Sequence, residues 1–500
     1  MHSAQKIIVS AITFLLVLTI VPAFAETSTS ANEKKTQAFY DSIRSHQLTL
    51  RGFISEMPKG GDLRVQLQGS VYPEAYLALA EKENYCITLP SYFPVPPINN
   101  TCPPGTTSTK KFFETEENYQ KALDALSSTT IDNASHLFSI DTLTADQFGF
   151  LLSTIVNNAE YQHLDYLEIL LPWFPKELTK PASRIKWQGT AKDMFPTLAA
   201  LPKMSATEEG EKLLSDFMSS TEAHLESNNA KSVMVRMIAN VDRTQPPSVV
   251  FAQLIFAFKT ASADPRFVGV ALSGDEKHPV ALRDYQLQME MLNFLKSKNE
   301  FSDVKTVITA GYLNFGMIEP TKFKNRIRTA LSKGKASRIS HGSALMYENN
   351  PFALLKILSN NKIPVEIGFT AEEQARFIAK DNNPFPVLLK YHVPIVIVSV
   401  DAGLTRTDIT NEYVRAARDY PLSYTELKNL VRNTLEYSLL PGKSLWKTTS
   451  PYVVGDDCND SLTTKTTGVC QKLLNESPKA NKQWKLETEF AEFERKIAAN

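Results

Sequence analysis

Two polar side chains stand at alternate positions on a short apolar stretch early in the sequence. Arg64 and Gln66 alternate with Leu63, Val65 and Leu67, just before a Gly-Ser break. This period of two is typical of a β-strand, and the residues that follow have the pattern of an amphipathic helix. Polar groups on an otherwise buried strand need polar surroundings. In an α/β barrel these occur along the axis near the carboxyl ends of the strands, where active sites form.

The rest of the chain supplies the elements that such a barrel needs. Seven further short apolar runs follow, and several of them are nearly continuous in Val and Ile, as parallel strands covered on both faces are. The runs lie at residues 166–171, 232–239, 266–274, 304–311, 337–342, 363–370 and 393–401. Helical patterns lie between them, at residues 207–227, 247–260, 282–296, 321–332 and 351–360. Together with the first strand, they predict an α/β fold of the (β/α)8 TIM barrel type.

An open, doubly wound sheet is the alternative architecture. It lacks support because no Gly-rich phosphate loop follows any of the runs. We expect the barrel to occupy residues 57–445 and to end with a helix at 424–439.

Two segments flank the barrel. Residues 26–56 are expected to form a leader that is flexible to about Lys35 and continues as a helix at 37–53. Residues 446–500 are expected to form an appendage with a charged helix at 481–499, because they are too poor in apolar residues to build a core of their own.

The N-terminus has the features of a signal peptide. Lys6 precedes an apolar run at residues 7–23, and Ala-Phe-Ala before Glu26 fits a signal-peptidase site. We expect residues 1–25 to be removed and the mature protein to be exported, periplasmic or secreted. The alternative is an uncleaved membrane anchor, because a run of this length borders on what can span a bilayer.

The four cysteines form two sequence-local pairs, Cys86 with Cys102 and Cys458 with Cys470. Each pair encloses a loop rich in Pro, Asn, Thr or Gly, and in an oxidising compartment such pairs are typical of disulfides. A zinc site would need closer Cys spacing or interleaved His. We therefore expect two disulfides, the first of which closes a proline-rich insertion at residues 84–109.

The charge balance argues against two kinds of partner. Lys+Arg and Asp+Glu number 54 each in 500 residues. Nothing in this balance suggests nucleic acid or an anionic membrane. We expect no nucleic-acid partner, and no membrane partner after signal cleavage; the sequence identifies no protein partner.

The stretch at residues 57–80, MPKGGDLRVQLQGSVYPEAYLALA, resembles the opening motif of the adenosine deaminase family, MPKGxDLHxHLxGSxxxE. Later strand ends resemble further family motifs in the right order: LSGDE for LAGDE, TAGY for HAGE, SHG for the sixth-strand His-Gly, and Asp-Ala for Asp-Asp. The resemblance spans about residues 57–440. It implies the barrel fold and, for the family, zinc-dependent hydrolytic deamination of purine nucleosides.

Most of the family's metal ligands are replaced in this chain. The two zinc-binding histidines of the first strand fall on Arg64 and Gln66. In the HAGE motif, the zinc-ligand histidine falls on Thr309 and the catalytic glutamate on Tyr312. Arginine is permanently cationic and donates no lone pair, while glutamine and threonine are weak ligands. We therefore expect no cofactor here, although the family uses zinc.

Three family positions are retained. His341 matches the histidine that orients the zinc-bound water, and Asp401 matches the zinc-ligand aspartate, although Ala402 replaces the second aspartate. Gly274 matches the glycine that approaches the purine ring. The resemblance thus implies that His341 and Asp401 are remnants of a catalytic site, and that Arg64, Gln66, Gly274, Thr309 and Tyr312 line a ligand site.

Arg64 invites a specific prediction. Without zinc, Asp401 would be an uncompensated buried charge. We predict that the Arg64 guanidinium occupies the metal position and pairs with Asp401, while Gln66 completes the hydrogen bonds. The alternative is that Arg64 extends to solvent through the barrel mouth.

Other polar residues are weaker candidates. His278 lies near the expected mouth, whereas His392 is expected on the loop that enters the eighth strand, at the opposite end. Glu366 points either to the axis, where it would replace the lost acid, or to the helices. Three further histidines are expected to be surface or core residues: His136, His163 and His224.

Two functions remain open. The first is an adenosine deaminase-like pseudoenzyme that binds a purine nucleoside or a protein, with donors from Gly274 and His341 and stacking by Tyr312. The second is an enzyme: a purine deaminase with a rebuilt metal site, or a hydrolase that uses His341 as a base near Asp401. Metal content and chelator-sensitive deamination separate the two.

Overall fold

The computed structural model describes residues 30–127, 143–174, 176–201, 205–227, 233–376, 378, 380–458, 466 and 468–499. The expected signal peptide and His136 lie outside these residues. Within them, no helix combines the length and the apolar character needed to cross a bilayer.

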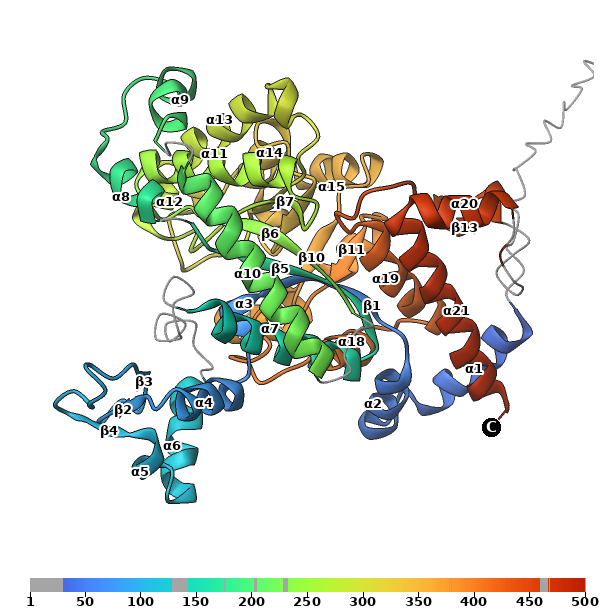
Figure 1. Cartoon of the computed structure of the whole chain (residues 1–500). Coiled ribbons are helices and arrows are strands. Elements are labelled where there is room, and N and C mark those ends of the chain that lie inside the picture. Colours follow the sequence, from blue (N-terminus) through green and yellow to red (C-terminus); the bar gives the residue numbers. More distant parts are fainter. Residues whose placement is uncertain are drawn as a thin grey trace, which may run out of the picture.

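Eight parallel strands form the barrel, in the order β1-β5-β6-β7-β8-β9-β10-β11 (Figure 1). Their bounds are Gly60–Gln66, Leu164–Leu171, Met234–Asp242, Phe267–Ser273, Thr306–Thr309, Arg338–Ser340, Val365–Ile367 and Ile395–Ile397. The sheet closes between its first and last strands, where Val65 and Val400 form a parallel bridge and the Gln66 N–H donates to the Val400 carbonyl at 3.1 Å. The predicted TIM barrel is confirmed, and the open sheet is wrong.

The last four strands are shorter than their apolar runs. β9 ends at Ser340 because His341 takes a left-handed backbone conformation, with φ of +61°. β11 ends earlier, at Ile397, and the run after it reaches a left-handed residue at Val400, whose φ is also +61°. The final residues of these runs therefore leave the sheet and form the mouth of the barrel.

The outer helices follow the predicted pattern with two exceptions. The helix expected at 282–296 is divided at Asp284, and the one expected at 321–332 begins only after Asn325, whose φ is +66°. The helices that follow the strands are α7 (Ala145–Tyr161), α8 (Lys176–Arg184), α9 (Ala191–Ala199), α10 (Ser205–Ser227), α11 (Pro247–Ala263), α12 (Pro279–Arg283), α13 (Tyr285–Lys296), α14 (Arg326–Ser332), α15 (Pro351–Asn360), α16 (Phe369–Arg376), α17 (Phe385–Lys390), α18 (Ile409–Asp419) and α19 (Tyr424–Glu436).

The segment before the barrel differs from its prediction. It contains two helices, α1 (Ala31–Ile43) and α2 (Gln47–Glu56), instead of one. α1 begins within the expected flexible leader because the Ser30 side chain accepts a hydrogen bond from the Glu33 N–H, which caps the helix. The chain leaves the helical conformation at His46, where φ is −110°.

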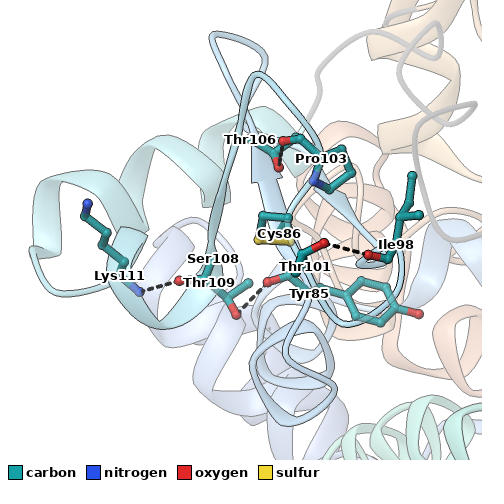
Figure 2. Close-up of a disulfide and its surroundings, with 10 residues drawn as sticks. Tyr85, Cys86, Ile98, Thr101, Pro103, Thr106, Ser108, Thr109 and Lys111 are labelled. Atoms are coloured by element: carbon teal, nitrogen blue, oxygen red, sulfur yellow. Dashed lines mark hydrogen bonds between the residues drawn. A yellow bond between two sulfur atoms is a disulfide. The ribbon is translucent and has the colours of Figure 1, made fainter.

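A disulfide-closed insertion follows the first barrel helices, α3 (Leu67–Ser70) and α4 (Pro73–Lys82), and extends away from the barrel (Figure 1). Its small sheet comprises β2 (Cys86–Thr88), β3 (Pro94–Val95) and β4 (Thr106–Ser108), and α5 (Thr109–Phe112) and α6 (Glu116–Leu126) follow. The predicted Cys86–Cys102 disulfide is confirmed. Figure 2 shows its surroundings, where the Thr109 hydroxyl donates to the Tyr85 carbonyl and joins the residue before β2 to the residue after β4 at one end of the sheet.

The C-terminal segment contains a small hairpin and two helices. These are β12 (Trp446–Thr449), β13 (Tyr452–Val454), α20 (Gly468–Glu476) and α21 (Pro478–Ala499). The Cys458–Cys470 disulfide is also confirmed. α21 lies beside α1 and α19 (Figure 1), and its Leu486, Phe490 and Phe493 belong to the main hydrophobic core of the barrel.

Candidate functional site

Strand β1 turns Arg64 into the barrel. Its pairing with β5 shifts register between Asp62 and Val65, which marks a β-bulge. In a regular strand, Asp62 and Arg64 would face the same side. Here Asp62 instead borders a small cavity between the barrel and the helices α7 and α18, while Arg64 reaches residues of strands β8, β9 and β10. The bulge thus directs neighbouring charges to opposite sides of the sheet.

Arg64 is enclosed by strand side chains. Its Nη1 donates to the Ser340 Oγ at 2.6 Å and lies 3.4 Å from a Glu366 carboxylate oxygen, and its Nη2 is 3.4 Å from the Thr309 Oγ1. The predicted ion pair with Asp401 is wrong, because the ion pair of Arg64 is with Glu366. The alternative, a side chain that extends to solvent, is also wrong, because Arg64 is only 3% exposed.

Glu366 connects Arg64 to a second buried arginine, Arg338 at the start of β9. Arg338 binds Glu366 through Nε and Glu168 of β5 through Nη2, the latter at 2.6 Å. Burial works against the charge on Arg338, but the two carboxylates outweigh it and raise its pKa above the ordinary value. We name the alternating series Glu168, Arg338, Glu366 and Arg64 the axis network; all four residues are at most 3% exposed.

The axis network is anchored by uncharged groups as well. The Tyr166 hydroxyl donates to Glu168 at 3.0 Å, and the Leu439 N–H donates to the same carboxylate at 2.6 Å. Arg338 donates to the Leu63 carbonyl at 2.9 Å. Two buried carboxylates and two buried guanidinium groups therefore compensate one another, as buried charges must.

Gln66 and Asp401 meet across the barrel seam. The Gln66 Nε2 donates to the Asp401 Oδ2 at 3.5 Å. Gly69 lies directly against this carboxylate: a Cβ atom at Gly69 would stand 2.0 Å from the Asp401 Oδ1. The Ser70 Oγ donates to the Val400 carbonyl at 2.8 Å. Gly69 and Ser70 after β1 thus pack directly against Asp401 and the residue before it.

His341 lies at the end of β9 and is 3% exposed. Its Nδ1 is 3.7 Å from an oxygen of Glu372, which is fully buried, and its ring is edge-on to the ring of Tyr312 at a centroid distance of 6.1 Å. A neighbouring carboxylate is able to hold the imidazole in one orientation.

Tyr312 follows β8 and is tied to the end of β7. Its hydroxyl donates to Asp275, and its N–H donates to a Glu276 oxygen at 2.9 Å. Gly274 precedes both carboxylates with φ of +106°, and a Cβ there would lie 2.6 Å from the Asp242 Oδ1. The local chain path therefore requires this glycine, and its contact with a purine remains a prediction.

Glu276 is itself held by two arginines. The Arg326 Nε lies 3.0 Å from it and the Arg243 Nη1 3.6 Å, and both guanidinium groups stack on the ring of Tyr285. Arg243 also donates to the Thr309 carbonyl at 2.6 Å, which joins this group to the Arg64 site.

The donor set at the strand ends does not fit zinc. Arg64, Gln66 and Thr309 stand at the matching positions, and Arg64 places a fixed positive charge among them. Among the residues that the structure describes, no group of three His, Cys, Asp or Glu side chains is placed to hold a metal ion. We therefore derive no chemical step through zinc.

The sequence-predicted site residues fall into linked groups. Arg64 and Thr309 meet at the axis, Gln66 and Asp401 at the seam, and His341 and Tyr312 at the mouth. Sequence reasoning missed Glu168, Arg338 and Ser340. Their signal was present, because each is a charged or polar residue inside a predicted apolar strand.

The other polar candidates lie apart from these groups. His224 contacts Asp146 on α7 at 3.1 Å, and His278 caps the N-terminus of α12. His392 lies on the loop before β11, and its carbonyl accepts a hydrogen bond from the Ser359 hydroxyl. Glu366 points to the axis, but it holds two arginines there.

A closed parallel sheet with polar groups at the strand ends of one mouth defines a (β/α)8 barrel. Residues 202–448 match the family model described as Adenosine deaminase. This part of the chain is therefore similar to the adenosine deaminase family.

Individual relatives agree with this similarity. An aminodeoxyfutalosine deaminase of Streptomyces coelicolor is 34% identical over 118 residues, which cover 23% of this chain and 30% of the relative. An adenosine deaminase-like protein of Drosophila pseudoobscura is 21% identical over 312 residues, 59% of this chain and 82% of the relative. The chain thus matches less than a third of the length of the Streptomyces protein.

A solved structure shares the fold. A zinc-bound amidohydrolase from Burkholderia ambifaria superposes with a TM-score of 0.51 at 14% identity, over 90% of this chain and 95% of the other. At this identity the likeness shows the barrel alone.

Proposed function

We propose that this protein is an exported, metal-independent member of the adenosine deaminase family that binds a purine-type nucleoside at the carboxyl ends of its barrel strands. It does not carry out zinc-dependent deamination. The observation that carries the proposal is the position of Arg64, which is fixed by Ser340, Glu366 and Thr309 where the family motif has zinc-binding histidines.

Ligand binding is supported by the groups that the mouth retains. Tyr312 and His341 lie edge to face and offer aromatic surface and a hydrogen-bonding imidazole, and Gln66 and Asp401 supply an amide and a carboxylate. A planar base with several donors and acceptors suits such a mixture. The family's substrate class gives the same answer.

A second function has one observation in its favour. His341 lies 3.7 Å from the Glu372 carboxylate, an arrangement that would orient it as a general base. A hydrolase without zinc would use this pair together with Asp401.

Metal analysis and nucleoside binding test the proposal. We expect the purified protein to contain far less than one zinc per chain and to leave adenosine unchanged. Adenosine, inosine or guanosine is expected to raise the melting temperature, because a ligand that binds only the folded state stabilises it. Tyr312→Ala is expected to weaken this effect, whereas Tyr161→Ala, an 88% exposed tyrosine at the end of α7, leaves it unchanged.

Two further outcomes complete the test. A triple variant, Arg64→His with Gln66→His and Thr309→His, is expected to gain zinc because it supplies three imidazoles beside Asp401. Stoichiometric zinc in the unaltered protein, with chelator-sensitive formation of inosine, would refute the proposal. Metal-free hydrolysis lost in Glu372→Gln would favour the second function. Mass spectrometry of the exported protein is expected to show Glu26 as its first residue.

A further inference from the structure

The C-terminal helix and the amino-terminal end of the barrel enclose a cleft on the side away from the mouth. Its volume is about 530 Å³, within the range of small-molecule sites. We name it the amino-end cleft. Its walls come from three parts of the chain: the end of α2 with Pro58, the junction of α7 and β5, and one face of α21.

Carboxylates outnumber cations in the amino-end cleft. Two lysines line it, Lys485 and Lys496, and both are already engaged: Lys485 lies between Asp165 and Glu489, and Lys496 lies 3.0 Å from Glu492. His163 adds no charge at neutral pH, because burial and Lys59 lower its pKa. The five carboxylates are Glu56, Glu160, Asp165, Glu489 and Glu492.

One lysine is insufficient for the two inner carboxylates. Asp165 has a side chain that is only 7% exposed, and its Oδ1 pairs with Lys485. Its Oδ2 receives no hydrogen bond from a cation or a backbone N–H among the described residues, while protonated Glu489 donates a hydrogen bond to this carboxylate. Glu489 lies one turn after Lys485 on α21, 3.3 Å from its ammonium group, so Glu489 and Asp165 share this lysine. Burial first, and Asp165 second, raise the pKa of Glu489 to about 7. The pair would be stabilised by one more positive charge.

Apolar surface lies beside these carboxylates. Leu164 and Phe493 are 5% and 6% exposed, and Ile497 continues this wall along α21. A ligand that combines an ammonium group with a short hydrocarbon chain would match both parts, because the charge meets the carboxylates while the methylenes cover the apolar wall.

We propose that the amino-end cleft binds a small aliphatic amine, whose ammonium group is held by Glu489 and Asp165 and whose alkyl chain lies on Phe493 and Leu164. The site is separate from the barrel mouth and does not depend on the function proposed there.

Isothermal titration of the full mature chain with 1,4-diaminobutane at about pH 8 and low salt tests the proposal. We expect saturable binding, and no binding of the uncharged analogue 1,4-butanediol. Glu489→Gln should weaken the affinity about tenfold through loss of a charge-assisted hydrogen bond. The matched control is Glu290→Gln on α13. Glu290 also lies 3.3 Å from a lysine, Lys333, but outside the cleft, so this variant should leave the affinity unchanged.

The pH dependence supplies a readout that a purely structural role would not affect. The titratable groups that line the cleft with Glu489 come from every element packed there. They are Lys485, Glu492 and Lys496 on its own helix, Glu160 of α7, His163 in the turn after α7, Asp165 of β5 and Glu56 of α2. The affinity should rise between about pH 6 and 8 as Glu489 loses its proton, and this rise should vanish in Glu489→Gln.

Glu56→Gln, on a different element, should weaken binding several-fold without disturbing α21, and it provides an answer if Glu489→Gln fails to fold. Equal binding of the diol, no binding of the diamine, or equal affinity of the Glu489, Glu56 and Glu290 variants would overturn the proposal.

Discussion

The axis network and the amino-end cleft both contain carboxylates beside cations, but they balance them differently. In the axis network, two carboxylates alternate with two guanidinium groups, and every member is almost completely buried. In the amino-end cleft, five carboxylates line a surface with two lysines, and all of these charges except that of Asp165 reach solvent. A compensated buried series is a structural element, whereas an uncompensated, accessible group can take up a ligand or a proton.

The largest effect should follow from breaking the axis network at Arg338. Arg338→Met leaves Glu168 and Glu366 buried without their shared cation, and we expect it to lower the free energy of unfolding by about 3–5 kcal/mol. Urea denaturation followed by circular dichroism measures the loss. Lys333→Met, which removes an exposed partner of Glu290, should change stability by no more than about 1 kcal/mol. Equal effects of the two variants would show that the axis network is not structurally special.

A smaller effect concerns Asp62, which is buried like the axis carboxylates but has Ser399 and the Arg64 N–H as partners instead of a guanidinium group. Burial raises its pKa to about 6. The native state therefore holds this proton more tightly than the unfolded chain, so its contribution to stability is full below about pH 4 and is lost as the pH rises through 6.

Asp62→Asn removes this titration. Between about pH 4.5 and 7.5, the stability of the unaltered protein relative to the variant should fall by about 2 kcal/mol. Urea unfolding of both proteins across this range measures it. A constant difference would show that Asp62 remains charged without a cation, and the contrast with the axis network would fail.

The smallest effect on the barrel should come from the first disulfide. Cys86→Ser with Cys102→Ser frees a loop whose closure is worth about 3 kcal/mol if the insertion and the barrel unfold together. Because the insertion extends away from the barrel, we expect the barrel transition to change by less than about 1 kcal/mol, while limited proteolysis within residues 84–109 accelerates. A full 3 kcal/mol loss would show that the insertion is part of the barrel's cooperative unit.

The barrel could be predicted because its signals are local. Each apolar run is long enough to be recognised, and the run at residues 166–171 differs from β5 (Leu164–Leu171) by only two residues. The end of β9 could not be predicted in the same way, because it depends on the left-handed conformation of His341, which the apolar pattern does not reveal.

The positions of the candidate site residues could be predicted from the sequence, but the residue that pairs with Arg64 could not. The sequence placed Arg64 at the axis and Gln66 beside Asp401, and both placements agree with the contacts in the structure. The partner of Arg64 was wrong because a carboxylate on another strand, Glu366, competes for it. The bulge in β1, which sets the direction of Arg64, arises from pairing with β5 and leaves no mark in the local sequence.

The seam between β1 and β11 has a consequence for folding kinetics. Asp62 and Ser399, which bond across it, are 337 residues apart in sequence, and Tyr40 and Leu422, which join α1 to the segment before α19, are 382 apart. Contacts of such separation form slowly because the loop they close must be ordered first. During synthesis the first strand of the barrel has to wait, with one edge unpaired, until nearly the whole protein has been made.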